Sequence, residues 1–234
     1  MKKTLALLLL LPLITSSLSA QKNEIKPGIV DKKFSDFTLV THDGKQFSMH
    51  DLLGKNVLLI VPRGKYKDDA WCTICNYQYA DFADIELTQH IREKYNLEIV
   101  FLFPYGKELY DEWVSIFPDE MKKVEQWKNP GDTSNLTSQQ KGWMMFAREY
   151  FPKSFDFSEK EVPLPLPILI DTDQEVSKGL DLSRTEWDGS KTLQNIPAVY
   201  IIDKDGILRF KYISQSTIDR PSPDYILNFI EKML

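Results

Sequence analysis

The sequence predicts an α/β fold with a central mixed sheet, an N-terminal β-hairpin and an inserted helical segment. Two observations lead to this prediction. Two aliphatic and aromatic runs, 56–61 and 98–103, flank a stretch from Cys72 to about Tyr95 without glycine or proline. Strand, helix and strand in that order form a βαβ unit, whose strands are parallel and joined by a right-handed crossover. Two pairs of short strands, each pair separated by Asp-Gly, add antiparallel hairpins.

The N-terminal hairpin is expected from residues 36–40 and 46–49, on either side of Asp43-Gly44. The next strand, 56–61, contains the continuous apolar run of a strand buried on both faces, and it ends at Pro62. The long helix that begins at Cys72 follows after a short loop. Its apolar residues recur at helical spacing; they are Ala80, Ala83, Leu87 and Ile91.

Residues 105–165 form the predicted insertion. Helices are expected at 107–116 and 139–150, with a turn at 129–132, where Asn, Pro, Gly and Asp follow one another. The segment is rich in tryptophan, which suggests a small core of its own or, alternatively, a lid or a wall of the substrate site.

The remaining elements follow from proline stereochemistry, β-branched runs and helix-capping residues. In order, we expect an extended segment at 163–167, a strand at 168–170, a short helix at 173–180, a hairpin of 198–202 and 207–212, and a final helix capped by Ser222 with Pro223 at its first position.

The N-terminus has the pattern of a secretory signal peptide. Basic Lys2 and Lys3 precede an apolar run over 5–14, and small residues follow up to Ala20. The run is too short to span a bilayer, which takes about 20 residues. We therefore predict a signal peptide at 1–20, one domain at 21–234 that contains the 105–165 insertion, and export, most naturally to a bacterial periplasm. An uncleaved N-terminal anchor and secretion are the alternatives.

Charge excludes one class of partner. The formal net charge is −5, and Lys and Arg are spread along the chain rather than clustered. Nucleic-acid binding requires a basic patch or stripe, so no nucleic-acid partner is expected. After signal cleavage, no integral membrane segment is expected either.

The two cysteines of the chain, Cys72 and Cys75, are three positions apart. At the start of a helix, free N–H groups and the positive dipole end stabilise a thiolate and lower its pKa. We predict that Cys72 is the nucleophile and that Cys75 resolves the mixed disulfide that Cys72 forms. The redox-active group is then the Cys72–Cys75 disulfide, and no cofactor is predicted. An inert structural disulfide is the rival interpretation. However, a disulfide that closes a loop of about four residues stabilises the folded protein by only about 2 kcal/mol, whereas one that closes a loop of about 100 residues contributes about 4.7 kcal/mol.

A metal site is the other rival. A copper chaperone of similar fold would need a histidine facing the cysteines from the C-terminal half. All three histidines, His42, His50 and His90, lie in the first 90 residues, and zinc lacks four plausible ligands. No metal is predicted.

Beyond these patterns, the order of elements resembles the thioredoxin superfamily, and more narrowly its exported TlpA/ResA-like or AhpC/TSA (redoxin) branch. The matching segments are Phe37-Thr38-Leu39, Asp43-Gly44-Lys45, Gly54 to Leu59, Trp71-Cys72 with Cys75, and Ile196-Pro197-Ala198-Val199 running on to Asp203, Asp205 and Gly206. The resemblance implies a thioredoxin-like three-layer sandwich. It further implies that Pro197 is a cis-proline against the cysteines, and that Ile196 and Pro197 help to bind substrate. Trp71 either covers the pair or simply packs in the core.

The sequence departs from the peroxiredoxin pattern, which asks for Pro-x-x-x-Thr/Ser before the cysteine and an arginine beside a later strand. Arg63 and Arg184 are the nearest candidates for that arginine, and neither is at the expected place. We therefore expect dithiol–disulfide exchange with a disulfide-containing protein or a small thiol substrate, sustained by a thiol electron donor. A peroxiredoxin-like thiol peroxidase is the alternative.

Overall fold

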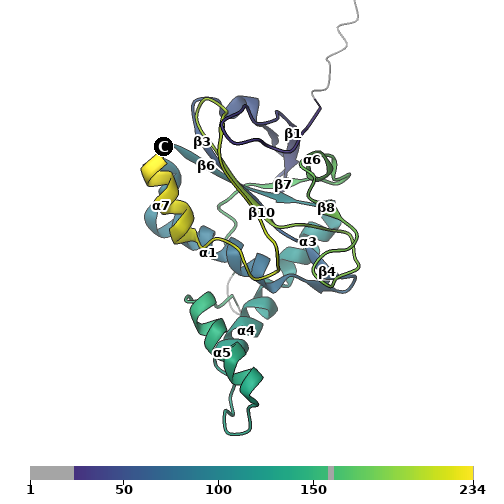
Figure 1. The fold of residues 1–234 in the computed structure, drawn as a ribbon, viewed down its shortest axis with the longest axis vertical. Coiled ribbons are helices and arrows are strands. Elements are labelled where there is room, and N and C mark those ends of the chain that lie inside the picture. Colours follow the sequence, from purple (N-terminus) through teal and green to yellow (C-terminus); the bar gives the residue numbers. More distant parts are fainter. Residues whose placement is uncertain (1–23, 158–160, 234) are drawn as a thin grey trace, which may run out of the picture.

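The structure, a computed structural model, describes residues 24–157 and 161–233. The signal peptide predicted at 1–20 therefore lies outside the described residues. A seven-stranded sheet organises the described chain (Figure 1). From one edge to the other its strands are β11 (Leu208–Ile213), β10 (Ala198–Ile202), β3 (Asn56–Val61), β6 (Leu97–Phe103), β7 (Ile168–Ile170), β1 (Thr38–Thr41) and β2 (Gln46–Ser48).

The sheet is mixed, as predicted. β3, β6 and β7 run parallel, with Leu58 opposite Ile99 in the central pair, and the remaining pairs are antiparallel. Both predicted hairpins are present, β1 with β2 and β10 with β11. The central strands are buried on both faces, which explains their continuous apolar sequence.

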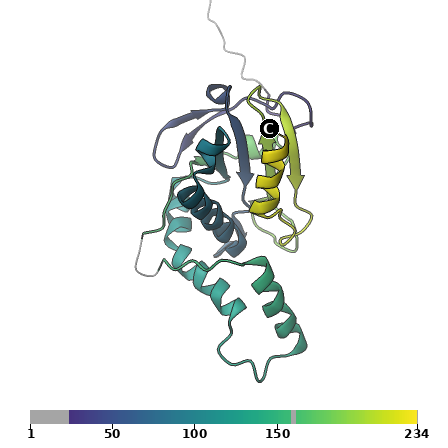
Figure 2. The ribbon, with the colours of Figure 1, turned by 90° about the vertical axis from the view of Figure 1, so that its left-hand side faces the viewer.

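Helices cover both faces of the sheet (Figures 1 and 2). They are η1 (His50–Leu52), α1 (Thr73–Gln89), α2 (Ile91–Lys94), α3 (Lys107–Ser115), α4 (Phe117–Lys128), α5 (Ser138–Tyr150), α6 (Glu175–Gly179) and α7 (Pro223–Met233). One core cluster joins α1, α3, α4 and α7 to one face, and a second joins α6 and the N-terminal segment to the other. Two short ladders, β4 (Lys65–Lys67) with β5 (Ala70–Trp71) and β8 (Ser183–Arg184) with β9 (Gln194–Asn195), flank the body.

The long helix predicted from Cys72 to about Tyr95 is divided. His90 adopts a left-handed conformation, with φ of 50°, and separates α1 from α2. The Arg92 N–H group instead donates to the Glu86 carboxylate at 3.0 Å. A left-handed residue ends an α-helix, and here the position is occupied by neither glycine nor proline, so the sequence pattern gave no indication of it.

The insertion projects from the body as a helical hairpin of α4 and α5 (Figures 1 and 2). α3 and α5 match the predicted helices, whereas α4 was not predicted. Every residue from Thr73 to Ala83 is buried, because the sheet covers one side of α1 and the insertion packs on another.

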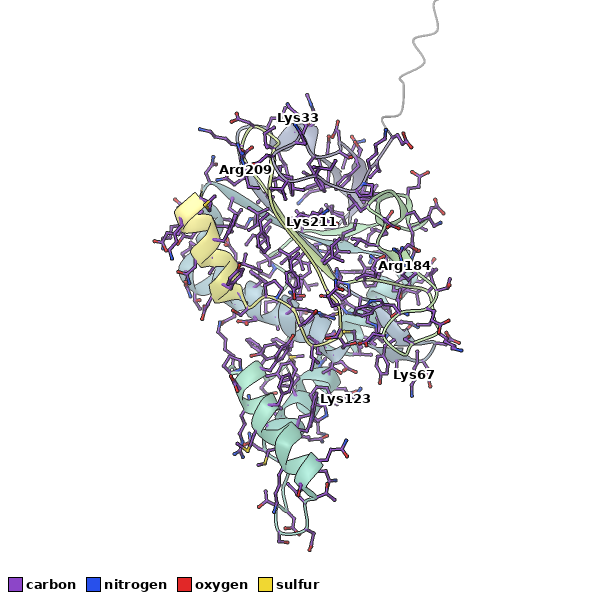
Figure 3. All side chains as sticks on the ribbon, in the orientation of Figure 1. Lys33, Lys67, Lys123, Arg184, Arg209 and Lys211 are labelled. Atoms are coloured by element: carbon purple, nitrogen blue, oxygen red, sulfur yellow. The ribbon has the colours of Figure 1, made fainter. Side chains whose placement is uncertain are left out.

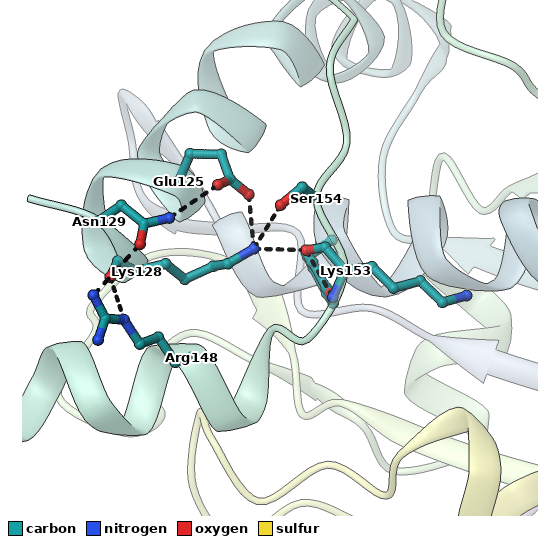
Figure 4. Close-up of polar contacts among 7 residues, drawn as sticks. Glu125, Lys128, Asn129, Arg148, Lys153 and Ser154 are labelled. Atoms are coloured by element: carbon teal, nitrogen blue, oxygen red, sulfur yellow. Dashed lines mark hydrogen bonds and ion pairs between the residues drawn. The ribbon is translucent and has the colours of Figure 1, made fainter.

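A buried lysine fixes this hairpin (Figure 4). Lys128 donates to the Glu125 carboxylate at 2.8 Å, and to the Lys153 carbonyl and the Ser154 hydroxyl at 2.9 Å each. Arg148 of α5 donates to the Lys128 carbonyl at 2.8 Å. The same lysine therefore ties α4 to α5 and to the segment that returns to the sheet.

Basic side chains do not gather in one place among the labelled residues of Figure 3. These residues lie on separate parts of the chain: Lys33 before β1, Lys67 on β4, Lys123 on α4, Arg184 on β8, and Arg209 and Lys211 on β11. None of the described helices has the length and apolar character needed to cross a bilayer.

Candidate active site at the head of α1

The two cysteines lie where the chain enters α1. Cys72 is the N-cap residue, with extended backbone angles, and Cys75 lies in the first turn. Both are reduced, and they are only 4% and 1% exposed. The predicted arrangement is present: one sulfur at the open end of the helix, and the other one turn further in.

The loop that follows β3 holds this helix start in place. The Cys72 N–H group donates to the Gly64 carbonyl at 3.0 Å, and the Arg63 N–H group donates to the Cys75 sulfur at 3.3 Å. Gly64 has φ of +86°, and a Cβ atom there would lie 2.6 Å from the ring of Tyr105. A glycine is therefore required both by the backbone conformation and by the close approach of the tyrosine.

Arg220 contacts both sulfurs of the pair. Its Nη1 donates to the Cys75 sulfur and its Nη2 to the Cys72 sulfur, each at 3.3 Å. The residue lies on the segment between β11 and α7. The planar guanidinium thus spans both sulfurs with two parallel N–H groups, a geometry that a lysine cannot reproduce.

These contacts separate the acidities of the two thiols. Burial alone would raise the pKa of Cys72, but hydrogen bonds from Cys75 and the charge of Arg220 outweigh it and lower the pKa to about 5. Burial raises the pKa of Cys75, as does its role as donor to the Cys72 sulfur. Burial would also lower the pKa of Arg220, yet the two sulfurs raise it, so the guanidinium stays charged. At neutral pH the pair is one thiolate and one thiol.

Trp71 lies in the same core cluster as the cysteines. Its ring stacks on Phe103 at 5.8 Å, its indole N–H donates to Glu112 of α3 at 2.8 Å, and it is 3% exposed. Both expectations for this residue, a cover beside the pair and a core side chain, fit that position.

Ile196 and Pro197 occupy the strand entrance expected from the resemblance, but the predicted cis bond is absent. No described peptide bond is cis, so the expected cis-Pro197 is wrong for this structure. The trans form is the lower-energy isomer of an X–Pro bond, and hydrogen bonds on both sides accommodate it: Ile196 N–H to Leu182 and Ser214 N–H to the Pro197 carbonyl. The Ile196 side chain packs in the second core cluster, on the sheet face opposite the cysteines.

Neither arginine singled out from the sequence brings its guanidinium to the sulfurs. Arg63 is buried and donates to Gln194, Thr217 and the Trp187 carbonyl, so it joins three loops around the site. Arg184 pairs with Asp181 at 3.0 Å at the edge of the body (Figure 3).

Arg220 was missed by sequence reasoning. It is 145 positions from Cys75 and in no motif with it, and its approach depends on how the chain turns after β11. The Arg220-Pro221-Ser222-Pro223 segment before a helix was the one local feature that could have drawn attention to it.

The insertion also reaches the site. The Thr73 hydroxyl donates to the buried Glu120 of α4, which Lys123 contacts from the same helix. At the end of α5, burial raises the pKa of Tyr150, while the Arg220 backbone hydrogen-bonds to its hydroxyl. The inserted helices are therefore part of the surroundings of the cysteine pair rather than a separate unit.

Comparison with known proteins identifies a family and a fold. The AhpC/TSA family profile matches residues 30–211. No curated protein matches the sequence. A reduced 2-Cys peroxiredoxin of Plasmodium vivax is similar in structure, with a TM-score of 0.52, 17% identity, and coverage of 88% of this chain and 81% of that one.

Two further solved structures are comparable. A mutant of the peroxiredoxin 6 of Arenicola marina has a TM-score of 0.54 and 15% identity, over 87% of this chain and 72% of that one. The mitochondrial 2-Cys peroxiredoxin of Plasmodium falciparum has a TM-score of 0.53 and 15% identity, over 88% and 94%. At such identities these likenesses concern the fold, and they confirm the predicted thioredoxin-like architecture. Arg220 lies beyond the matched family segment.

Proposed function

The chain belongs to the AhpC/TSA family, and on that premise we propose that it is a thiol–disulfide oxidoreductase whose redox centre is the Cys72–Cys75 pair. The family itself indicates thiol-based oxidoreductase chemistry. The finer assignment is supported by one observation above all: a single charged guanidinium spans both sulfurs at the head of α1.

The proposed cycle uses two electrons. The Cys72 thiolate attacks one sulfur of a substrate disulfide, forms a mixed disulfide and releases the other substrate sulfur as a thiolate. Cys75 then loses its proton and attacks the Cys72 sulfur. The substrate leaves as a dithiol, and the pair becomes a disulfide. A thiol electron donor reduces it again, and no further cofactor takes part.

Arg220 supports both steps. In the resting state it stabilises the Cys72 thiolate, which is the attacking species. In the second step its other N–H group is already on the Cys75 sulfur, where negative charge must develop for resolution to occur. The raised pKa of Cys75 keeps that sulfur protonated until the mixed disulfide has formed.

A thiol peroxidase is the second candidate, and one observation favours it. The sequence offered no guanidinium for the peroxide, but Arg220 supplies one at 3.3 Å from the Cys72 sulfur. It could stabilise the leaving oxygen while the thiolate is oxidised to a sulfenic acid, which Cys75 would convert to a disulfide with loss of water. The hydroxyl of the peroxiredoxin pattern is missing ahead of Cys72, because position 69 is an aspartate.

Two assays test the assignment. Reduced protein should reduce insulin disulfides with dithiothreitol as donor. Cys72→Ser should abolish this activity. Cys75→Ser should accumulate a covalent substrate adduct that is visible by mass spectrometry. Full activity in Cys72→Ser would refute the proposal. Stopped-flow oxidation by hydrogen peroxide separates the second candidate, because a peroxidase reacts far faster than a free thiol.

We also propose that the protein acts after export, on the grounds of its N-terminal sequence. An oxidising compartment supplies disulfide substrates, and it requires a dedicated donor to keep the pair reduced. Fractionation of cells that express the full chain, with N-terminal sequencing of the product, tests this localisation.

A further inference from the structure

A groove runs along α1 from beside the cysteine pair. Its floor is one face of that helix, with residues at positions 74, 77, 78, 81, 85 and 89, and its volume is about 560 Å³. The fifteen steps of α-helix from position 74 to position 89 extend about 22 Å, which matches six or seven residues of extended chain at about 3.3 Å each. The groove is therefore long and narrow rather than round.

Two other elements, α5 and the segment that leads into α7, form its walls. Phe146, Glu149 and Tyr150 of α5 line one side, and the segment from Arg220 to Asp224 with Leu227 of α7 lines the other. One end of the groove is thus Arg220, which contacts both sulfurs. A substrate bound here would lie against Arg220, the lining residue that contacts both sulfurs.

The lining combines apolar side chains with uncompensated negative charge. Lys153 is already paired with Asp81 at 2.9 Å and with Asp84 at 2.7 Å, and Arg220 is engaged by the sulfurs. Among the described residues, no cation pairs with the carboxylate of Glu149 or of Asp224. A ligand with a basic group would therefore gain electrostatic energy that a neutral or acidic one would not.

Hydrogen-bonding groups in the groove also lack partners. Within the described chain, the side-chain amide of Gln78 makes no hydrogen bond. A backbone carbonyl of a bound polypeptide is the kind of acceptor that would pair with the N–H groups of this amide. An acyl chain has no such group along its length.

We propose that this groove binds an extended segment of a polypeptide substrate, with apolar and basic residues next to the cysteine that Cys72 attacks. The inference rests on the proposed disulfide exchange and adds to it the substrate class and the place where that substrate lies. It gives the inserted helices a role, since α5 supplies one wall and the unpaired Glu149.

Single-turnover thiol exchange tests the proposal. The probes are synthetic peptides with one cysteine carried as a mixed disulfide with 5-thio-2-nitrobenzoate and flanked on both sides by leucine and lysine, or by leucine and glutamate. In Cys75→Ser protein the Cys72 thiolate attacks the peptide sulfur. It forms the peptide–enzyme disulfide and releases the yellow thionitrobenzoate, whose appearance gives the rate. The rate at which dithiothreitol releases thionitrobenzoate from each peptide is measured as well, and it corrects for the intrinsic reactivity of that peptide.

After that correction, the lysine peptide should react about tenfold faster than the glutamate peptide, and added salt should reduce the preference. Glu149→Lys in the same background should abolish the preference. Glu108→Lys, which makes the same charge change on exposed α3 outside the groove, should retain it.

The two possible failures are distinguishable. Equal corrected rates for both peptides, or an unchanged preference in Glu149→Lys, would overturn the groove assignment while the exchange chemistry stands. Absence of thionitrobenzoate release from either peptide and from the free dithiobis reagent would refute the proposed function, and the groove assignment with it.

Discussion

At the scale of single residues, Arg220 has more influence on the candidate site than any motif residue except the cysteines. It donates one hydrogen bond to each sulfur. Together with the hydrogen bond from Cys75, its charge outweighs the burial that would otherwise raise the pKa of Cys72. The acidity of Cys72 therefore depends on a side chain from the far end of the sequence as well as on its own helix.

Replacing this arginine should change the titration of the nucleophile. In Arg220→Met, the pH midpoint of Cys72 alkylation should rise from about 5 by about two units, because an adjacent opposite charge shifts a pKa by about 1–3 units. Arg220→Lys should give a smaller rise, since it retains the charge without the two-pronged contact. Alkylation with iodoacetamide at pH values from 4 to 9, quantified by mass spectrometry, measures the midpoint. Arg184→Met is the control, and an unshifted midpoint in Arg220→Met would contradict the assignment.

Gly64 is the second residue on which the site depends, because its carbonyl holds the N–H group of Cys72. Gly64→Ala should lower the free energy of unfolding by about 2–3 kcal/mol, since it combines backbone strain with a clash at Tyr105. Gly44→Ala is a matched control: its φ is +83°, yet a Cβ there would meet no atom within 4 Å. It should cost about 1 kcal/mol. Urea denaturation measures both, and equal losses would exclude the steric contribution of Tyr105.

At the scale of elements, the insertion is attached to the body through buried polar contacts as well as apolar ones. Lys128 binds three acceptors at the junction of α4, α5 and the returning segment (Figure 4). Lys153 continues the connection to α1 through Asp81 and Asp84. Removing a buried donor from such a network leaves its acceptors unsatisfied.

Lys128→Met should therefore lower the free energy of unfolding by about 2 kcal/mol, since it removes a buried donor shared by a carboxylate, a carbonyl and a hydroxyl. The loss should be local first, so amide hydrogen exchange should accelerate in α4 and α5 more than in the central strands. Lys122→Met, at an exposed position of the same helix, should leave both measurements unchanged. Uniform acceleration throughout the sheet would show that the hairpin does not open independently.

Elements specified by local patterns could be predicted from the sequence, and those specified by tertiary contacts could not. The strand at 56–61 coincides with β3, because an apolar run bounded by proline determines a buried strand without reference to the rest of the chain. α4 was missed although Pro118 lies at its start. A proline costs little in the first turn of a helix, but without the structure it indicates a break.

At the scale of the whole molecule, the candidate site also combines features that a local pattern predicts with features that only tertiary contacts specify. The Cys72–Cys75 spacing at a helix start is a local feature and was predicted. The approach of Arg220, the trans Ile196–Pro197 bond and the placement of Tyr150 beside Arg220 depend on how distant segments pack. The fold thus brings residues from α1, the insertion and the last loop to one point, and the stability of the whole molecule should depend on the charge state at that point.

The dependence of the free energy of unfolding on pH, through the ionisation of Cys72, has a definite sign. The pKa of Cys72 is about 5 in the folded protein, against about 8.5 for an unperturbed cysteine. Between these values the unfolded chain binds the extra proton, so the free energy of unfolding of the reduced protein should rise with pH from about 5 to about 8. This contribution is fully present near pH 8 and is lost as the pH falls through about 5. Above that window the raised pKa of Cys75 acts in the opposite direction.

Urea denaturation of the reduced protein and of Cys72→Ser, at intervals from pH 5 to 8, measures this contribution. The difference between the two curves isolates Cys72, because the remaining titrating groups are common to both proteins. The difference should widen steadily with pH in favour of the native chain. Parallel curves would mean that the thiolate of Cys72 is no more stable in the folded protein than in the unfolded chain. The electrostatic role of Arg220 at the sulfurs would then be excluded, even with the fold intact.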